Sequence, residues 1–230
     1  HIPLIGAVDR QEVYRLIEER PFCVSISGHT HYHEHRFIDA ADGWRGKQPH
    51  HHMINVTVSG SWWGGNRDER GIPHSMMSDG APNGYSIMAF NHHNYQLDFY
   101  PAGRAPNYQM DVVLPEKIPA SQWKALPVIA NVFNARPQDR VEARIGHDGS
   151  WTVMENYTGT APYFVEVRQR ELKPDGTPMF GEPHATNHLW RVNLGAFGKE
   201  LPAGHHLLQV RWIDDQGRET LANKVLMISE

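Results

Sequence analysis

The stretch SGHTHYHEH, residues 27–35, carries a histidine at every second position: His29, His31, His33 and His35. Neutral imidazole is a common ligand for zinc, iron and nickel. Two histidines at i and i+2 can share one ion on an extended segment, or reach separate ions where a strand turns into a loop. Gly28 permits an unusual backbone angle and a close approach at this point. The same alternation can also mark one polar strand face, so the residue types alone leave a metal site and a solvated face both open.

A short helix and an apolar strand are expected to position these histidines. Asp9 followed by RQEVYRLIEER predicts an N-cap and an amphipathic helix with Val13, Leu16 and Ile17 on one face, ended by Pro21. The run PFCVSIS predicts a buried strand that delivers GHTH to its C-terminal end. Strand ends of this kind are where α/β proteins build their sites.

A second strand-like run, MINVTVSG, precedes a long glycine-rich loop, SWWGGNRDERGIPHSMMSDGAPNG. A loop of this length inside a domain is usually functional or disordered, and its two tryptophans favour order because their apolar area must be buried. YSIMAF and YQLDFY, separated by NHHN, predict a β-hairpin. His50, His51 and His52 precede the strand-like run; one of them could face the site, but we expect this run of three to be exposed.

The last hundred residues alternate between apolar and polar side chains. PEKIPASQWKALP carries three prolines and predicts a linker. RVEARIG, FVEVRQREL and LLQVRWI then predict strands, with turns at HDGS, KPDGT and DDQGRE. Short alternating strands at this spacing are typical of a β-sandwich. The side chains expected in its core include Val141, Ala143, Ile145, Trp190, Leu208, Val210 and Trp212.

Composition excludes several classes of partner. The chain has 230 residues and a formal net charge of −4, and no run of Lys or Arg exceeds two, so we expect no obligatory nucleic-acid partner. No apolar stretch approaches the roughly 18 residues of a membrane span. The single cysteine, Cys23, cannot form an internal disulfide and is expected to be a small buried hydrophobe.

The apolar strand running into SGHTH, about 25 residues after HIPL, resembles the C-terminal half of the calcineurin-like metallophosphoesterases. That superfamily carries the ordered motifs DxH, GD, GNH(D/E), a lone His and GHxH; HIPL is similar to the fourth and GHTH to the fifth. The SGSWW…DGAPNGY block, ANVFNA and WTVMENY resemble a bacterial subfamily with a dedicated C-terminal region. The resemblance implies a mainly β chain: half of an α/β phosphoesterase domain over residues 1–114, a linker over 115–125, and an immunoglobulin-like β-sandwich over 126–230.

The resemblance also implies a metal centre. His1 and His29 would bind one divalent ion and His31 its neighbour, with Fe, Mn, Zn and Ni equally suited to the ligands. In such a centre two ions bind the phosphoryl oxygens and hold a hydroxide nucleophile. DxH, GD and GNH(D/E) are absent from these 230 residues. We therefore expect a fragment of a phosphoesterase acting on small-molecule mono- or diesters, inactive alone and partnered by a missing N-terminal half.

Further residues are candidates for contact with substrate. His33 and His35 could orient the ligand histidines or lie on an exposed rim. Trp62 and Trp63, with Asp79 and Asn83, could form a substrate wall in which an indole stacks on a sugar or base and Asp79 accepts hydroxyl hydrogen bonds. The tryptophans could instead plug the junction between the two domains.

Two other functions compete with hydrolysis. The sandwich could be a carbohydrate- or protein-binding module, which an exposed aromatic row would favour. A copper enzyme using the amine and ring of an N-terminal His1 is the other alternative, although the disulfides usual in such enzymes are impossible with one cysteine. The resemblance further implies export to the periplasm or cell surface. Exposed sheet edges of a half-domain would permit a homodimer.

Overall fold

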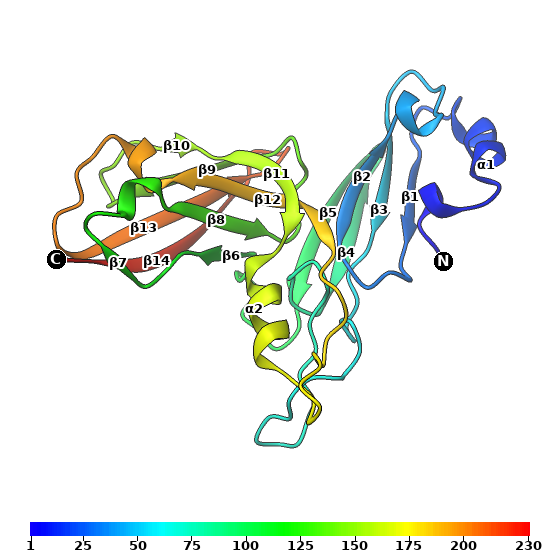
Figure 1. The fold of residues 1–230 in the computed structure, drawn as a ribbon. Coiled ribbons are helices and arrows are strands. Elements are labelled where there is room, and N and C mark those ends of the chain that lie inside the picture. The colour runs from blue at the N-terminus through cyan, green and yellow to red at the C-terminus, as the bar shows by residue number, and fades with distance from the viewer. The chain divides into compact units, whose positions relative to one another are not determined.

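The computed structural model of the chain describes residues 1–230 and is mainly β, with 40% strand and 13% helix. It contains two compact units (Figure 1). The first unit comprises residues 1–104 and 164–184, and the second comprises residues 105–163 and 185–230. This division differs from the predicted boundaries at 114 and 126, because a segment that follows β11 in the chain joins the first unit. None of the helices combines the length and apolar character needed to cross a membrane.

The first unit is built around a three-stranded sheet in the order β1-β3-β2. The strands are β1 (Val24–Ser27), β2 (Glu34–Ile38) and β3 (His50–Ile54); β1 runs parallel to β3, and β2 antiparallel to it. Helix α1 (Arg10–Ile17) covers one face through Tyr14, whose ring lies 5.6 Å from that of Trp44. The predicted helix is confirmed, although the Asp9 side chain makes no capping hydrogen bond. The predicted strand into GHTH is confirmed as β1, but it is not the buried strand expected, because Ser27 is its one buried residue and Ile26 is exposed. The predicted apolar face is wrong at Leu16, which is exposed.

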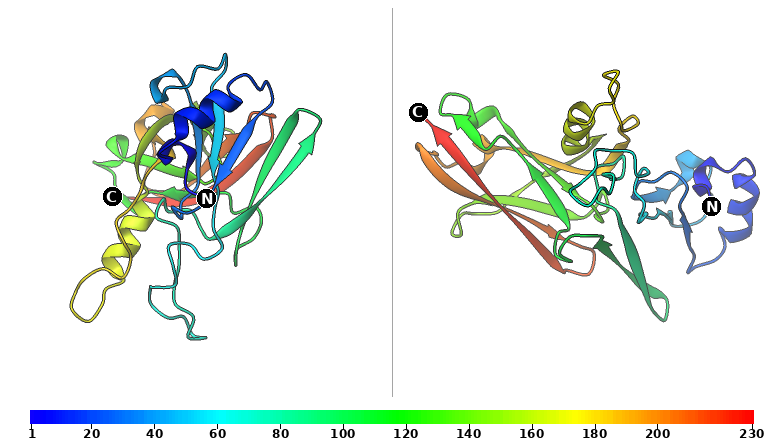
Figure 2. Two further views of the ribbon diagram at one scale, coloured as in Figure 1. Left: turned by 90° about the vertical axis from the view of Figure 1, so that its right-hand side faces the viewer. Right: turned by 90° about the horizontal axis from the view of Figure 1, so that it is seen from below.

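The opposite face of this sheet is covered by the predicted hairpin, which is confirmed as β4 (Gly84–Asn91) and β5 (Asn94–Pro101). Figure 2 shows it as a long two-stranded ribbon. One face of the hairpin buries Leu97 and Phe99 of β5, whereas its other face exposes Tyr85 and Ile87 of β4. The strand expected over MINVTVSG is β3, which begins earlier and ends at Ile54.

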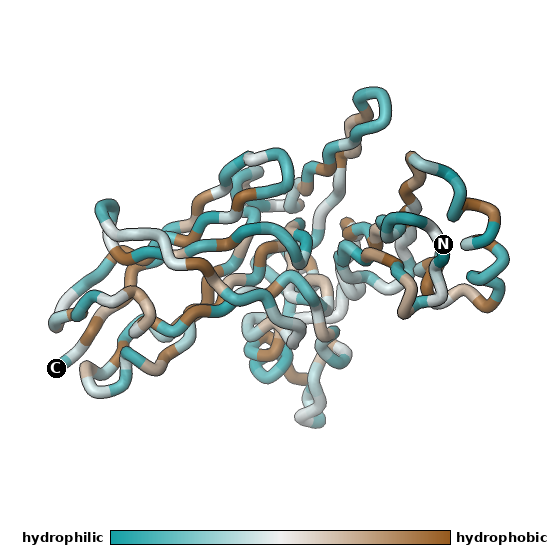
Figure 3. The backbone as a smooth tube through the Cα atoms, turned by 90° about the horizontal axis from the view of Figure 1, so that it is seen from above, coloured by the Kyte–Doolittle hydropathy of each residue, from teal (hydrophilic) through white to brown (hydrophobic).

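The second unit is a β-sandwich of a four-stranded and a five-stranded sheet. The first has the order β11 (Glu155–Thr160), β12 (Ala185–Asn193), β8 (Pro127–Val132) and β6 (Met110–Val113). The second has the order β10 (Thr152–Val153), β9 (Arg140–Ile145), β13 (Gly204–Ile213), β14 (Glu219–Ser229) and β7 (Lys117–Pro119). All seven side chains predicted for its core are buried in one hydrophobic cluster that draws on both sheets. The underlying alternation is visible as short brown and teal segments along the strands in Figure 3.

Two segments differ from the sequence expectation. FVEVRQREL, predicted as a strand, forms α2 (Pro162–Arg170). A proline suits the first turn of a helix, and the buried Phe164 and Val167 are three residues apart, as one helical face requires. Residues 115–125, predicted as a linker, carry β7, which pairs in parallel with β14, and Trp123, which lies in the sandwich core. Four short 3-10 helices complete the elements: η1 (Leu4–Gly6), η2 (Ala40–Asp42), η3 (Trp123–Ala125) and η4 (Leu194–Phe197).

The sandwich core predicts the effect of removing one buried leucine. Leu208 is fully buried on β13, whereas Leu221 on β14 is half exposed. Leu208→Ala should lower the free energy of unfolding by about 2–5 kcal/mol, because it removes apolar contacts and leaves a cavity. Leu221→Ala should change it by roughly 0.5 kcal/mol or less. Urea unfolding followed by tryptophan fluorescence measures both variants, and equal effects would contradict this assignment of the core.

Candidate functional site

The two segments predicted to carry metal ligands lie side by side at the C-terminal end of β1. The Gly28 N–H donates to the His1 carbonyl at 3.0 Å. His29 Nδ1 lies 3.0 Å from His1 Nε2, and their rings meet edge to face. Two nitrogens bound to one ion at about 2.0–2.1 Å would stand about 3.0–3.4 Å apart. The pair therefore has the spacing of two ligands of one ion.

His31 points elsewhere and has a fixed tautomer. Its Nδ1 lies 2.5 Å from the Gly60 carbonyl, which can only accept a hydrogen bond. Nδ1 therefore carries a proton, and in the neutral tautomer Nε2 keeps its lone pair. Ligand histidines are commonly oriented by such a bond to a backbone carbonyl. His29 and His31 also have φ of +74° and +58°, and strained backbone of this kind concentrates at functional sites.

Gly60 is required at the position that holds His31. Its φ is +54°, in the left-handed region that favours glycine. A Cβ there would lie 2.2 Å from Asn83 Oδ1 and 2.9 Å from the backbone of Met76. Asn83, a predicted substrate contact, therefore lies against the Gly60 backbone.

His52 holds the first residues of the chain in place. Its Nε2 accepts from the Leu4 N–H at 3.2 Å and lies 3.0 Å from Ser27 Oγ. Because Nε2 accepts, Nδ1 carries the proton and donates to Ser25 Oγ at 2.7 Å, and that hydroxyl also lies 2.7 Å from His50 Nε2. Burial, reinforced by the nearby His50 and N-terminus, lowers the pKa of His52 to about 4. Burial also lowers the pKa of His50.

The expectation that His50, His51 and His52 are exposed is wrong. All three belong to β3 and are buried, and they alternate between the two faces of the sheet. His50 and His52 face α1, where serines of β1 bond them. His51 faces the hairpin, where its Nε2 lies 2.9 Å from His35 Nδ1 and its Nδ1 bonds the Tyr95 hydroxyl.

His33 and His35 are also buried, so neither lies on an exposed rim. Their rings meet edge to face, 5.1 Å apart. The His33 N–H donates to Asp79 Oδ2 at 2.7 Å, and the Ala81 N–H donates to Asp79 Oδ1 at 3.0 Å. Asp79 is fully buried, and its two oxygens accept backbone hydrogen bonds. The arrangement anchors the chain around His33 and differs from an aspartate presented to substrate hydroxyls.

The long loop presents two exposed tryptophans beside His31. Trp62 is 67% exposed and Trp63 is 50% exposed. The Trp62 ring centroid lies 4.7 Å from that of His31, with the planes tilted by 40°. Of the residues predicted from the sequence, the structure thus brings together His1 with His29, His31 with Trp62, and His33 with Asp79.

No local sequence pattern indicates Glu171, the residue that follows α2 and anchors this loop. Its buried carboxylate lies 2.8 Å from His74 Nδ1 and accepts from the Asn66 N–H at 2.8 Å. Gly65 has no space for a side chain, since a Cβ would lie 2.5 Å from Glu171 Oε2. Another residue of the same segment, His184, stacks on Tyr32 at 3.6 Å. Residues 164–184 therefore support the loop and the residue that follows His31.

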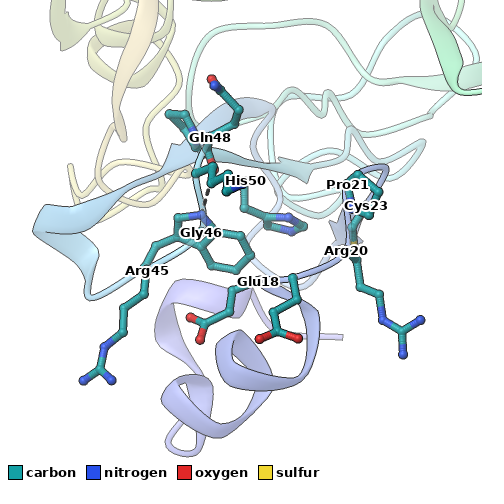
Figure 4. A pocket seen from close by; sticks show the side chains of 12 residues that line it. Glu18, Arg20, Pro21, Cys23, Arg45, Gly46, Gln48 and His50 are labelled. Atoms are coloured by element: carbon teal, nitrogen blue, oxygen red, sulfur yellow. Dashed lines mark hydrogen bonds between the residues drawn. The ribbon is translucent and has the colours of Figure 1, made fainter.

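A cavity of about 700 Å³ lies in the first unit, at the opposite ends of the same strands. Figure 4 shows Cys23, Gly46 and His50 in its wall, with Arg20 and Arg45 extending outward. Cys23 precedes β1 and His50 begins β3, whereas His29 follows the C-terminal end of β1. The cavity is thus about 13 Å, one length of β1, from the candidate ligands. The convergent histidines, and not the cavity, mark the candidate site.

The ligands present fit only part of a metal centre. His1 and His29 offer two convergent nitrogens, and His31 offers one lone pair at a separate position. No group of three or more His, Cys, Asp or Glu side chains in residues 1–230 is arranged to hold an ion. Divalent ions in catalytic sites usually have at least three protein ligands, so further ligands would have to complete each site.

Comparison with known families identifies the class of protein. The profile of the C-terminal domain of calcineurin-like phosphoesterases matches residues 52–219. The chain belongs to this family. A comparison with curated proteins found no match. Among solved structures, the chain is similar to the PmoD soluble domain from Methylocystis sp. ATCC 49242 (Rockwell), with 15% identity, 62% of this chain and 97% of that chain covered, and a TM-score of 0.26. A likeness at that level identifies neither a common fold nor a function.

The buried His52 predicts a pH dependence of stability. Its pKa in the folded chain is about 4, against 6.5 for the free side chain. Between these values the unfolded chain binds the proton and the folded chain does not, so the free energy of unfolding rises with pH. Acidification from pH 6.5 to 4 should remove up to about 3 kcal/mol through this group. Urea unfolding of the chain and of His52→Asn at several pH values measures it, and an unchanged pH slope in the variant would contradict the assignment.

The Glu171 carboxylate predicts a local loosening of the loop. Glu171→Ala leaves the Asn66 N–H and His74 without their partner, at a cost of about 1–3 kcal/mol. Amide hydrogen exchange over residues 59–76 should quicken by roughly tenfold or more. Glu166→Ala is the matched control, because this exposed glutamate of α2 pairs only with Arg170 in the same helix. Equal exchange in the two variants would refute the anchoring role.

Proposed function

We propose that this chain is part of a metal-dependent phosphoesterase and supplies His1, His29 and His31 to a two-metal centre. The observation that carries the proposal is the 3.0 Å contact between His1 Nε2 and His29 Nδ1 at the end of β1. Membership of the calcineurin-like phosphoesterase C-terminal family supports the same reaction class. The substrate would be a small-molecule phosphoric monoester or diester.

Each histidine would have a distinct task in this centre. His1 and His29 would hold one divalent ion between them, and His31 would offer Nε2 to the second, because its Nδ1–H is bonded to the Gly60 carbonyl. Bound ions of this kind polarise the phosphoryl oxygens and lower the pKa of a bound water. The Leu4–His52 hydrogen bond would keep His1 within reach of His29. Neutral His52 adds no positive charge near the ions.

The remaining ligands would come from a partner segment outside these 230 residues. Two observations support this part of the proposal. β1 lies at the edge of its sheet, with β3 as its one neighbour. Five large apolar side chains in the first 26 residues are exposed: Ile2, Val8, Leu16, Phe22 and Ile26. An open strand edge is suited to an added strand, and exposed apolar side chains such as Ile26 on β1 itself are suited to packing against it. A second copy of the chain is the alternative occupant of this edge.

The exposed aromatic side chains argue against the sandwich as a glycan-binding module. The exposed ones all lie in the first unit: Phe22, Trp62, Trp63, Tyr85 and Phe90. In the second unit, the guanidinium groups of Arg144 and Arg211 both lie over the Trp151 ring, each 4.3 Å from its centroid. The sandwich therefore has no open aromatic row for a sugar.

Metal titration of the chain tests the proposal. Isothermal titration with Mn²⁺ and Zn²⁺ should find an ion bound through His1 and His29. His29→Ala should weaken binding by roughly tenfold or more, because it removes one of two convergent donors. His205→Ala is the control, since this exposed histidine lies on β13 in the second unit. Hydrolysis of bis(4-nitrophenyl) phosphate should require the partner segment.

Three results would contradict the proposal. Equal metal affinity in His29→Ala and His205→Ala would remove the candidate site. A single Cu²⁺ ion, held far more tightly than Mn²⁺ and lost when one residue is added before His1, would favour a copper enzyme instead. Full hydrolytic activity of the chain in the presence of a chelator would exclude a metal-dependent reaction.

A further inference from the structure

Trp62 and Trp63 are distinct among the seven tryptophans of the chain. Four others, Trp44, Trp123, Trp190 and Trp212, are buried, and the fifth, Trp151, is half-buried with two arginines over its ring. Trp62 and Trp63 are 67% and 50% exposed. Leaving a large apolar side chain in water forgoes about 1.5–3 kcal/mol of burial free energy. Two such side chains in succession on one loop indicate a surface that a ligand could cover.

The loop around them is tied down by hydrogen bonds on both sides. The Ser61 N–H donates to the Met76 carbonyl at 2.8 Å, and the Gly65 N–H to the His74 carbonyl at 3.0 Å. The Trp62 carbonyl accepts from the Gly64 N–H at 3.0 Å and lies 2.9 Å from Ser75 Oγ. The φ of Trp62 is +71°, a strained value for a bulky residue that these bonds maintain. The indoles are therefore held in water by a fixed backbone, as in a preformed binding surface.

The two tryptophans lie beside His31, one of the candidate metal ligands. Trp62 packs on the ring of His31 at 4.7 Å, so one indole face is close to the histidine whose Nε2 carries the lone pair. A phosphoryl group near that nitrogen would carry its organic substituent over the two tryptophans. An indole offers a flat, uncharged surface. The substituent it recognises best has a flat apolar face of its own, either an aromatic ring or one side of a sugar ring.

From this geometry we propose that Trp62 and Trp63 form a stacking subsite for the ring of a ring-bearing phosphoester. The position of the phosphoryl group in this inference rests on the proposed function. The binding of the ring rests on the exposure of the two indoles and on the hydrogen bonds that hold their loop. Glu171 maintains the subsite, since its carboxylate holds the loop through His74 and the Asn66 N–H. A phosphoester whose organic group is an open carbon chain, without a ring, would bind through its phosphate alone.

Ligand binding to the chain, with and without Mn²⁺, tests the subsite. The probes are phenyl phosphate, glucose 1-phosphate and glycerol 3-phosphate. All three carry a phosphate, but the first has an aromatic ring, the second a sugar ring and the third no ring. Titrations are followed by the NMR shifts of the indole N–H groups. We expect at least one ring-bearing probe to bind fivefold or more tightly than glycerol 3-phosphate. The one that does so distinguishes an aromatic from a sugar substituent.

Three variants separate stacking from other effects. Trp62→Ala should abolish the preference for the ring, and Trp62→Tyr should retain most of it, because a smaller aromatic face remains. Trp151→Ala should leave it unchanged, since that indole lies in the second unit. Because the Trp62 side chain is exposed, its replacement by Ala or Tyr should leave the hydrophobic core of the first unit intact.

The outcomes distinguish this inference from the proposed function. A preference for ring-bearing probes that is lost in Trp62→Ala supports the subsite. If the chain shows this preference without Mn²⁺, the subsite is supported even where no metal binding through His1 and His29 is found. Equal affinity for all three probes, in a chain whose Mn²⁺ binding depends on His29, overturns the subsite and leaves the proposed function standing. A ring preference that survives in Trp62→Ala also overturns it.

Discussion

The hydrogen bond from the Leu4 N–H to His52 Nε2 holds the start of the chain against the three-stranded sheet, and the candidate site depends on it. The two candidate ligand segments lie on either side of this contact: His1 is three residues before Leu4, and His29 is two residues after Ser27, which also bonds His52. The bond requires neutral imidazole, since a protonated Nε2 cannot accept. Burial enforces that state by lowering the pKa of His52. The geometry of the candidate site thus depends on a buried polar group that bears no charge.

The sheet beneath the site has an unusual interior. Both faces of β3 bury imidazole: His50 and His52 towards α1, and His51 towards the hairpin. Buried polar groups are tolerated only when hydrogen-bonded, and each of these rings has partners from another element. Serines of β1 serve one face and Tyr95 of β5 the other. The polar contacts therefore fix which face of β3 meets which layer, a constraint that apolar side chains alone would impose less strictly.

The parts of the fold that follow a local period could be predicted from sequence. RVEARIG and LLQVRWI alternate in and out as strands, and the predicted hairpin and α1 also follow local signals. FVEVRQREL alternates equally well, yet it forms α2, because its residues pack at three-residue spacing in the first unit. His50–His52 have no apolar period, and their burial depends on serines and a tyrosine from distant strands. Such partners leave no trace in the local pattern.

For the site, the position of GHTH at a strand end was predictable from the apolar run before it, whereas the pairing of His1 with His29 was suggested by resemblance. Glu171 was not predictable, because it lies 97 residues from His74. This separation in the sequence also means that the loop is synthesised well before Glu171. Residues 59–83 emerge long before the segment that anchors them, and the sandwich cannot close until β14 joins β13 to β7. Because domains generally fold as they leave the ribosome, N-terminal first, the exposed tryptophans spend that interval on a loop held by its own hydrogen bonds alone, without the Glu171 contacts.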